Sequence, residues 1–309
     1  RRGKETPPVP NHEPVLLNET VEFLDVEPGK KYIDATLGGG GHASEILRFG
    51  GDVLGIAQDP MAIELSRKNL EGRGWKIKIV KGNFKDIKKV AGDNNFLPVD
   101  GIIFDLGMSS MQLDSPGRGF SFNKDEQLDM RMDPDNQGVT AEDLVNSLRE
   151  DQLYELFNET TQVNFSRAVS RALVRARSLK RIETTDELVG IISRALPRRR
   201  KTFARQRRAR VLRARHPATT LFMALRMAVN SEIENLKFGI EGALEVLGKG
   251  GRLVVISFHS GEDRVVKSFL REKERDGVIR VLTKKSSVPT WEEIRSNPRS
   301  RSAKLRAAE

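Results

Sequence analysis

DATLGGGGH, residues 34–42, joins an apolar, strand-like segment to a segment with helical periodicity. Four consecutive glycines permit backbone conformations that side chains exclude, and they let the backbone approach a ligand closely. In doubly wound α/β folds, the turn after the first strand lies at the carboxyl edge of the sheet, where nucleotide cofactors bind. The stretch therefore predicts such a sheet, with a cofactor site at this turn.

Around this turn, short apolar segments alternate with helical patterns, as in βαβ units whose helices cover both faces of a parallel sheet. After residue 115 the pattern becomes mostly helical, and the alternation resumes near residue 214. We therefore expect a discontinuous α/β domain, 1–115 and 214–309, interrupted by a helical insertion, 116–213. The expected strands are 31–36, 52–57, 76–80, 99–105, 253–258 and 278–282. The expected helices of the insertion are 142–157, 163–177 and 184–196, the last opened by a Thr184/Glu187 capping box.

Composition narrows the class of protein. Of 309 residues, 38% are hydrophobic and 31% charged, which is enough apolar material for a sizeable core. Cysteine is absent, so disulfide scaffolds, thiolate metal sites and cysteine nucleophiles are excluded, including the adduct used in methylation at pyrimidine carbon-5. No apolar run approaches the length of a membrane span. We expect a soluble protein of the cytoplasm or of an organellar matrix.

The positive charge is concentrated in one tract, RRRKTFARQRRARVLRAR (198–215), which holds ten Lys and Arg residues and no acid. The whole chain has a formal net charge of +10, so the remainder is close to neutral. Such a tract neutralises phosphates well and builds a core badly. It therefore predicts a nucleic-acid contact. The residues expected to make it are Arg198, Arg199, Arg200, Lys201, Arg205, Arg207 and Arg208.

Polar side chains follow the expected strands at their carboxyl ends. Asp34 and Asp105 end two of them, and a carboxylate there is costly unless it is paired, which favours a functional role. Asp59 follows another strand, where an acid would hold ribose hydroxyls, and Phe84 is expected to pack on adenine or in the core. His259 follows the strand 253–258 at the same edge.

Two cofactors fit the turn. Gly38, Gly40 and Ala43 satisfy the G-x-G-x-x-G/A pattern of nicotinamide dinucleotide sites, so an NAD(P)-dependent oxidoreductase is one alternative. Asp34, an acid inside the strand end, fits S-adenosylmethionine better, because that molecule carries a cationic amino group and a sulfonium and lacks a pyrophosphate. No metal site is expected.

Six motifs in order resemble the bacterial and organellar 16S-type rRNA cytosine-N4 methyltransferases. They are DATLGGGGH, DLGMSSMQLD (105–114), RGFSF (118–122), LDMRMD (128–133), ALRMAVN (224–230) and ISFHSGEDRVVK (256–267). The resemblance implies a Rossmann-like class I methyltransferase domain with a helical insertion. It also implies S-adenosylmethionine as cofactor, and as substrate a cytosine amine in the decoding centre of the small ribosomal subunit.

The resemblance further implies cofactor contacts, and an insertion that faces RNA. The implied cofactor contacts are Gly40, Gly41, His42, Phe84, Asp105 and Gln112. For catalysis we expect Asp105 and His259 to accept hydrogen bonds from the cytosine amine. Arg118, Arg131 and Arg226 are candidate RNA contacts or structural ion-pair partners. Whether the chain forms a homodimer stays open.

At some positions the chain departs from the family pattern. Ala57 stands where the family has an acid for the ribose hydroxyls, and losing such charge-assisted hydrogen bonds costs about 1.5–3 kcal/mol. Thr160, Thr220, Met223 and Gly261 also differ from the usual residues. These departures keep one more alternative open, a catalytically impaired RNA-binding or ribosome-assembly protein on the same fold.

Overall fold

The computed structural model describes residues 14–108, 112–113, 115–161, 165–196 and 217–309. The chain forms two compact units, Arg1–Ser110 with Ile233–Glu309, and Met111–Glu232. The predicted insertion, 116–213, falls inside the second unit. That unit continues to Glu232 because helix α11 (Pro217–Val229) packs against its other helices, so the α/β domain resumes later than the predicted residue 214.

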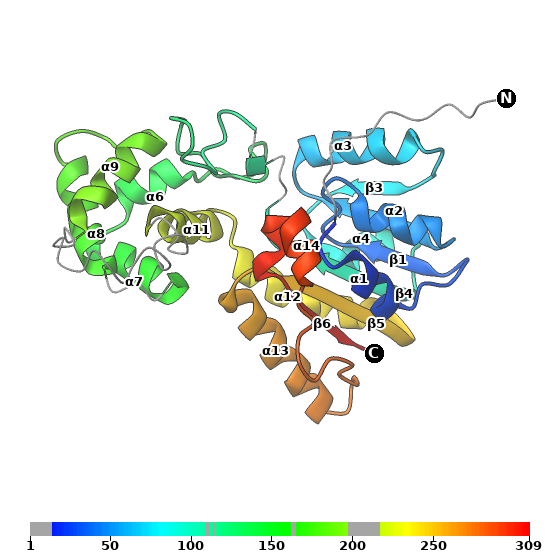
Figure 1. Ribbon diagram of the computed structural model, residues 1–309. Coiled ribbons are helices and arrows are strands. Elements are labelled where there is room, and N and C mark those ends of the chain that lie inside the picture. The colour runs from blue at the N-terminus through cyan, green and yellow to red at the C-terminus, as the bar shows by residue number, and fades with distance from the viewer. Residues whose placement is uncertain (1–13, 109–111, 114, 162–164, 197–216) are drawn as a thin grey trace. The chain divides into compact units, whose positions relative to one another are not determined.

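The first unit is built on a six-stranded sheet of order β3-β2-β1-β4-β5-β6 (Figure 1). Its strands are β1 (Lys31–Asp34), β2 (Asp52–Ala57), β3 (Lys78–Lys81), β4 (Val99–Asp105), β5 (Leu247–Ser257) and β6 (Lys304–Ala308). The first five are parallel, and β6 runs antiparallel to β5. This is a doubly wound, Rossmann-like sheet, and it confirms the predicted fold class.

The last strand is not where the sequence pattern predicted it. Residues 278–282 form no strand, and only Val281 makes an isolated bridge, to Ala308. The strand beside β5 is instead β6, a segment for which the sequence pattern predicts no strand. Its Arg306 is 8% exposed and its guanidinium donates to Asp263 at 2.7 Å. An ion pair therefore stabilises a buried position of this strand that an apolar side chain would usually occupy.

Helices cover both faces of the sheet because the strand residues alternate between two apolar faces (Figure 1). One face, with Ile102 and Phe104, packs against buried residues of α4, α12 and α13. On the other face, the backbone of Gly101 lies against Tyr32 and against Leu24 of α1. The helices of this unit are α1 (Leu17–Leu24), α2 (Gly41–Arg48), α3 (Pro60–Glu71), α4 (Ile87–Asp93), α12 (Glu232–Val246), α13 (Ser260–Arg275) and α14 (Trp291–Ser296).

The regular secondary structure of the second unit is helical, and the segment 115–140 before its first long helix consists of turns and irregular backbone. The helices of the unit are α6 (Ala141–Ser147), α7 (Glu150–Thr161), α8 (Ser166–Arg177), α9 (Thr185–Ala195) and α11. The predicted helix 142–157 is two helices, separated by an extended Leu148. The Thr184/Glu187 capping box is confirmed at the start of α9. Within the described ranges, no helix has both the length and the apolarity that a membrane span requires.

Candidate functional site at the carboxyl edge of the sheet

The carboxyl ends of β1 and β4 meet at the point where the strand order reverses. The chain passes from β1 outward to β2 and β3, and then returns to place β4 on the other side of β1. Asp34 pairs with Ile103, two residues before Asp105, so the two carboxylates end adjacent strands. Ligands of open α/β sheets bind in the crevice at this reversal. The predicted Asp34 and Asp105 therefore lie together at the expected position.

The glycine turn between β1 and α2 is closely packed against the rest of the unit. Gly40 has φ +81°, and a Cβ there would lie 3.0 Å from a methyl carbon of Leu70 in α3. A Cβ on Gly41 would lie 2.4 Å from Pro14. Close packing at both positions, together with the positive φ of Gly40, thus accounts for glycine here without a ligand, and the packing holds the turn and the start of α2 beside Asp34.

Asp34 is a buried carboxylate, 2% exposed. Its Oδ1 accepts the backbone N–H of Thr36 at 3.1 Å, and the backbone of Ala43 in α2 donates to it as well. Burial nevertheless outweighs these bonds and raises the pKa of Asp34 to about 7. Ionisation at neutral pH is therefore costly unless a cation approaches the carboxylate.

Only one oxygen of the Asp105 carboxylate has a polar partner among the described residues. Its Oδ2 lies 3.6 Å from Nδ1 of His42, whereas its buried Oδ1 has no hydrogen-bond partner among the described residues. Burial, and then the charges of Asp34 and Glu262, hold the pKa of Asp105 well above its usual range. One oxygen of this carboxyl group thus lacks the partner that a hydrogen-bond donor of a ligand would supply.

A hydrogen bond to a backbone carbonyl orients the ring of His42. Its Nε2 lies 3.0 Å from the carbonyl oxygen of Val15, and because a carbonyl only accepts, Nε2 carries the hydrogen. The ring nitrogen nearest Asp105 is therefore Nδ1, with the ring 5% exposed. His42 is a buried neighbour of the acidic pair, at the first turn of α2.

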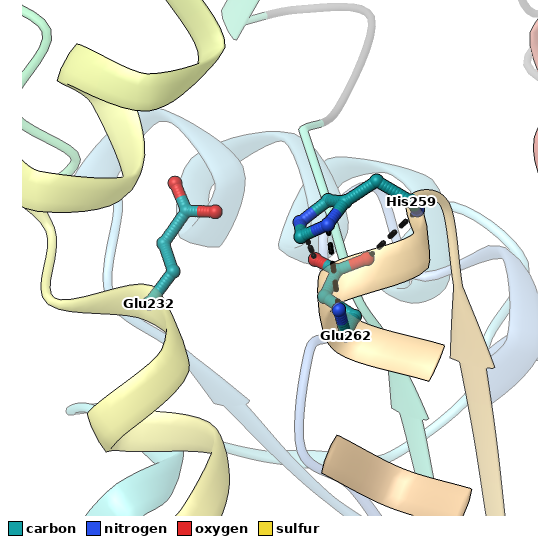
Figure 2. Close-up of side chains that lie close together, drawn as sticks. All are labelled: Glu232, His259 and Glu262. Carbon is teal, nitrogen blue, oxygen red and sulfur yellow. Dashed lines mark hydrogen bonds and ion pairs between the residues drawn. The ribbon is translucent and has the colours of Figure 1, made fainter. Parts of the chain in front are cut away.

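His259 caps helix α13 with its ring. Its Nδ1 accepts the backbone N–H groups of Gly261 at 3.2 Å and of Glu262 at 3.3 Å, while Glu262 accepts from the backbone of Phe258 at 2.8 Å. Figure 2 shows the contacts between His259 and Glu262. Because Nδ1 accepts, the ring hydrogen sits on Nε2, 3.2 Å from Glu262 Oε1. His259 can therefore donate a hydrogen bond from this nitrogen, but it has no nitrogen left to accept one, contrary to the acceptor role expected of it. The third side chain drawn, Glu232, ends the second unit, where it binds Arg226.

The acid that follows β2, Asp59, is used as a helix cap. Ala57 is buried, and Asp59 is 3% exposed and caps α3 by accepting the Met61 N–H at 3.0 Å. Phe84 is half-buried, with its ring edge-on to Phe104 at 5.5 Å and pressed against the backbone of Gly239. Of the two roles expected for Phe84, packing against the core is therefore confirmed, and contact with adenine stays a prediction.

Three arginines expected to contact RNA make intramolecular contacts in the second unit. Arg118 donates to the carbonyl oxygen of Arg131 at 2.9 Å. Arg131 forms two hydrogen bonds with the carboxylate of Asp129, at 2.8 and 2.7 Å. Arg226 binds Glu232 in the same way, with both distances 2.8 Å. The structural ion-pair alternative thus accounts for Arg131 and Arg226.

Two further parts of the predicted site are not placed beside it. Gln112 is 7% exposed within the second unit. The basic tract, Arg198–Lys201 with Arg205, Arg207 and Arg208, lies outside the described residues. The roles expected for these residues stay predictions.

Sequence reasoning missed two side chains that shape this edge. Thr36 Oγ1 accepts the backbone N–H of Asp105 at 2.6 Å, which ties the ends of β1 and β4 together. Glu262 completes the His259 cap. A His-x-x-Glu spacing after a strand is the signal that could have indicated it, since it matches a capping box with histidine in the place of serine or threonine.

The model of the MraW methylase family matches residues 10–309. The chain belongs to the MraW methylase family. The ribosomal RNA small subunit methyltransferase H of Carboxydothermus hydrogenoformans is 44% identical over 315 residues, which is 97% of each chain. The protein of the same name from Thermomicrobium roseum is 42% identical and covers 100% of this chain and 96% of its own. An rRNA methylase structure from Streptococcus thermophilus, at 12% identity and a TM-score of 0.42 over 95% of this chain and 92% of its own, is too distant to add to this assignment.

Proposed function

We propose that this MraW family member methylates the N4 amine of a cytosine in the decoding centre of 16S-type small-subunit rRNA, with S-adenosylmethionine as methyl donor. Relatives at 44% and 42% identity over nearly the whole chain are named as small-subunit rRNA methyltransferases. The observation that carries the proposal is the pair of carboxylates, buried Asp34 and half-buried Asp105, beside the glycine turn at the strand-order reversal.

The residues present fit this cofactor. The positive amino group and sulfonium of S-adenosylmethionine suit an edge where burial makes two carboxylates costly to ionise. A dinucleotide would instead bring a diphosphate to the same acidic edge, where like charges repel. The acidic edge therefore favours S-adenosylmethionine over NAD(P). Gly38, Gly40, Gly41 and His42 would form the wall of its site, with Phe84 beside the adenine.

Asp105 acts on the attacking nitrogen. The bound cofactor supplies a methyl group that is transferred by in-line displacement, so the protein has to hold the amine about 3 Å from the methyl carbon. The lone pair of the cytosine amine is delocalised into the ring. A hydrogen bond from the amine to the unpartnered Oδ1 of Asp105 would oppose that delocalisation and direct the lone pair at the methyl group. The same carboxylate would take the proton that the nitrogen loses as the methyl group is transferred and S-adenosylhomocysteine leaves.

His259 acts as a donor in this proposal. Its Nε2 hydrogen is the one ring hydrogen, so it can bind a cytosine acceptor atom, O2 or N3, and fix the orientation of the base. The target base has to be unstacked to enter such a site, which costs least in an irregular, single-stranded RNA region. Arg198, Arg199, Arg200, Lys201, Arg205, Arg207 and Arg208 would neutralise the phosphates around it.

The decisive experiment is methyl transfer from labelled S-adenosylmethionine to small ribosomal subunits that lack the modification, followed by nucleoside analysis. We expect N4-methylcytidine, with the rate lowered at least about 100-fold by Asp105→Ala because the acceptor is lost. Asp52→Ala, at an exposed carboxylate at the opposite end of a strand, is the matched control and should keep the wild-type rate.

The same assay separates the rival function. Ala57 at the end of β2 favours a protein that binds the subunit without modifying it. Tight binding of the subunit by folded protein, with no methylated nucleoside, would replace the enzyme proposal with that one. Methyl transfer at another atom of cytosine would contradict the N4 assignment alone.

A further inference from the structure

The carboxyl ends of β2 and β3 carry a pair of amide side chains. The backbone N–H of Gly82 donates to the carbonyl oxygen of Ala57 at 3.0 Å, so the residues after both strands lie side by side. Gln58 follows β2 and Asn83 follows β3, and Asn83 Nδ2 donates to Gln58 Oε1 at 2.8 Å. Both side chains are half-buried.

The orientation of both amides follows from a backbone contact. Asn83 Oδ1 accepts the backbone N–H of Lys85 at 3.0 Å, so this atom is oxygen and the other is the donor Nδ2. Gln58 must then accept through Oε1, which leaves Nε2 as its donor. No hydrogen-bond partner of Gln58 Nε2 occurs among the described residues. Its two hydrogens, with the second hydrogen of Asn83 Nδ2, are donors available at this edge.

This is the place in a doubly wound fold where the ribose of a nucleotide cofactor lies, normally against an acid at the end of the second strand. Here residue 57 is alanine, and the Asp59 carboxylate caps its own helix. We infer that the Gln58–Asn83 amide pair binds the ribose hydroxyls of the cofactor. The amides donate hydrogen bonds to the hydroxyl oxygens, whereas a carboxylate at this place would accept hydrogen bonds from the same hydroxyls. The inference rests on the proposed S-adenosyl cofactor.

Replacing an acid with an amide pair changes the strength of recognition. Hydrogen bonds between neutral groups are about half as strong as those to a charged group. Removing the ribose hydroxyls from the cofactor should therefore weaken its binding by about two- to tenfold. With a carboxylate in the same place, the loss of affinity would be about ten- to hundredfold.

The test is calorimetric binding of S-adenosylhomocysteine and of its analogue without the two ribose hydroxyls, which needs no RNA and no turnover. In the wild-type protein, removing the hydroxyls should weaken binding by up to about tenfold. In Gln58→Met, which keeps the side-chain length and removes the amide, the preference for the hydroxylated ligand should be smaller than in the wild-type protein, because only Asn83 is left to donate. Lys78→Met, exposed at the opposite end of β3, is the control and should keep the wild-type difference.

A second variant is expected to raise the affinity for S-adenosylhomocysteine. Gln58→Glu keeps an acceptor for Asn83 and adds a charge, so it should bind S-adenosylhomocysteine more tightly, by about tenfold. The inference is overturned if Gln58→Met retains the full preference for the hydroxylated ligand, or if the wild-type protein has no such preference. A wild-type protein that binds neither ligand would overturn the proposed cofactor itself, and the inference with it.

Discussion

At the scale of single residues, the glycine turn is constrained by its packing partners as well as by its backbone. Gly40 has φ +81°, and a Cβ there would be crowded by the side chain of Leu70 in α3, at 3.0 Å. Gly74 has nearly the same angle, φ +79°, with nothing within 4 Å of its Cβ position. The pair therefore separates the cost of the left-handed conformation from the cost of crowding.

We predict that Gly40→Ala lowers the free energy of unfolding more than Gly74→Ala does. Each alanine is held in an unfavourable conformation at a cost of about 1 kcal/mol, and Gly40→Ala adds a clash worth about 1–3 kcal/mol more. Urea unfolding of the two variants measures the difference. Equal losses would mean that Leu70 moves aside freely, and that the turn tolerates bulk.

At the scale of secondary-structure elements, the imidazole of His259 at the β5–α13 junction combines a capping role with the proposed hydrogen bond to the substrate base. His259 caps α13 through Nδ1, and its Nε2, which carries the ring hydrogen, is buried 3.2 Å from Glu262 Oε1. Substitution by alanine removes both, so it cannot show which duty matters for activity. Asparagine can restore the cap, because its side-chain oxygen accepts from the first turn of a helix, but it lacks the imidazole hydrogen.

We predict that His259→Ala lowers the free energy of unfolding by about 0.5–2 kcal/mol and that His259→Asn recovers most of this loss. Methyl transfer should stay low in both variants, because neither has an N–H at the position of Nε2. Thermal or urea unfolding measured beside the transfer rate makes the comparison. An asparagine variant with full activity would leave His259 with capping as its whole role.

At the scale of the whole molecule, the buried acids link stability to pH. Asp34 has a pKa of about 7 in the folded chain, far above the unfolded value, so between about pH 4 and 7 the folded state binds the extra proton. Raising the pH through this window removes that proton and destabilises the fold. The contribution is most favourable below the unfolded pKa and is fully lost above the folded one.

We predict that Asp34→Asn gains stability relative to the wild-type protein as the pH rises from 5 to 7, by up to about 1.4 kcal/mol per pH unit. The substituted amide has no charge to bury, so the cost of ionisation disappears. Urea unfolding at several pH values provides the measurement, and Asp52→Asn, the same substitution at an exposed carboxylate, is the matched control. A constant difference for Asp34→Asn would contradict the raised pKa.

Much of this protein could be predicted from its sequence because the decisive signals are local. The glycine turn, the strand patterns before Asp34 and Asp105, and the Thr184/Glu187 capping box each depend on residues within a few positions of one another. The sheet edge that gathers Asp34, Asp105 and His259 follows from the same local signals, because parallel strands end on one side.

Tertiary structure decided what depends on residues far apart in the chain. β6 was missed because its Arg306 is buried by pairing with Asp263, 43 positions away, so no apolar pattern marks the strand. The pairing of Gln58 with Asn83, 25 positions apart, was missed for the same reason. The cap of His259 and the ion pair between Arg131 and Asp129 join close neighbours in the chain, but they depend on the geometry of individual atoms. A sequence shows which side chains are present, whereas the hydrogen bond that each makes is fixed only when folding brings its partner within about 3 Å.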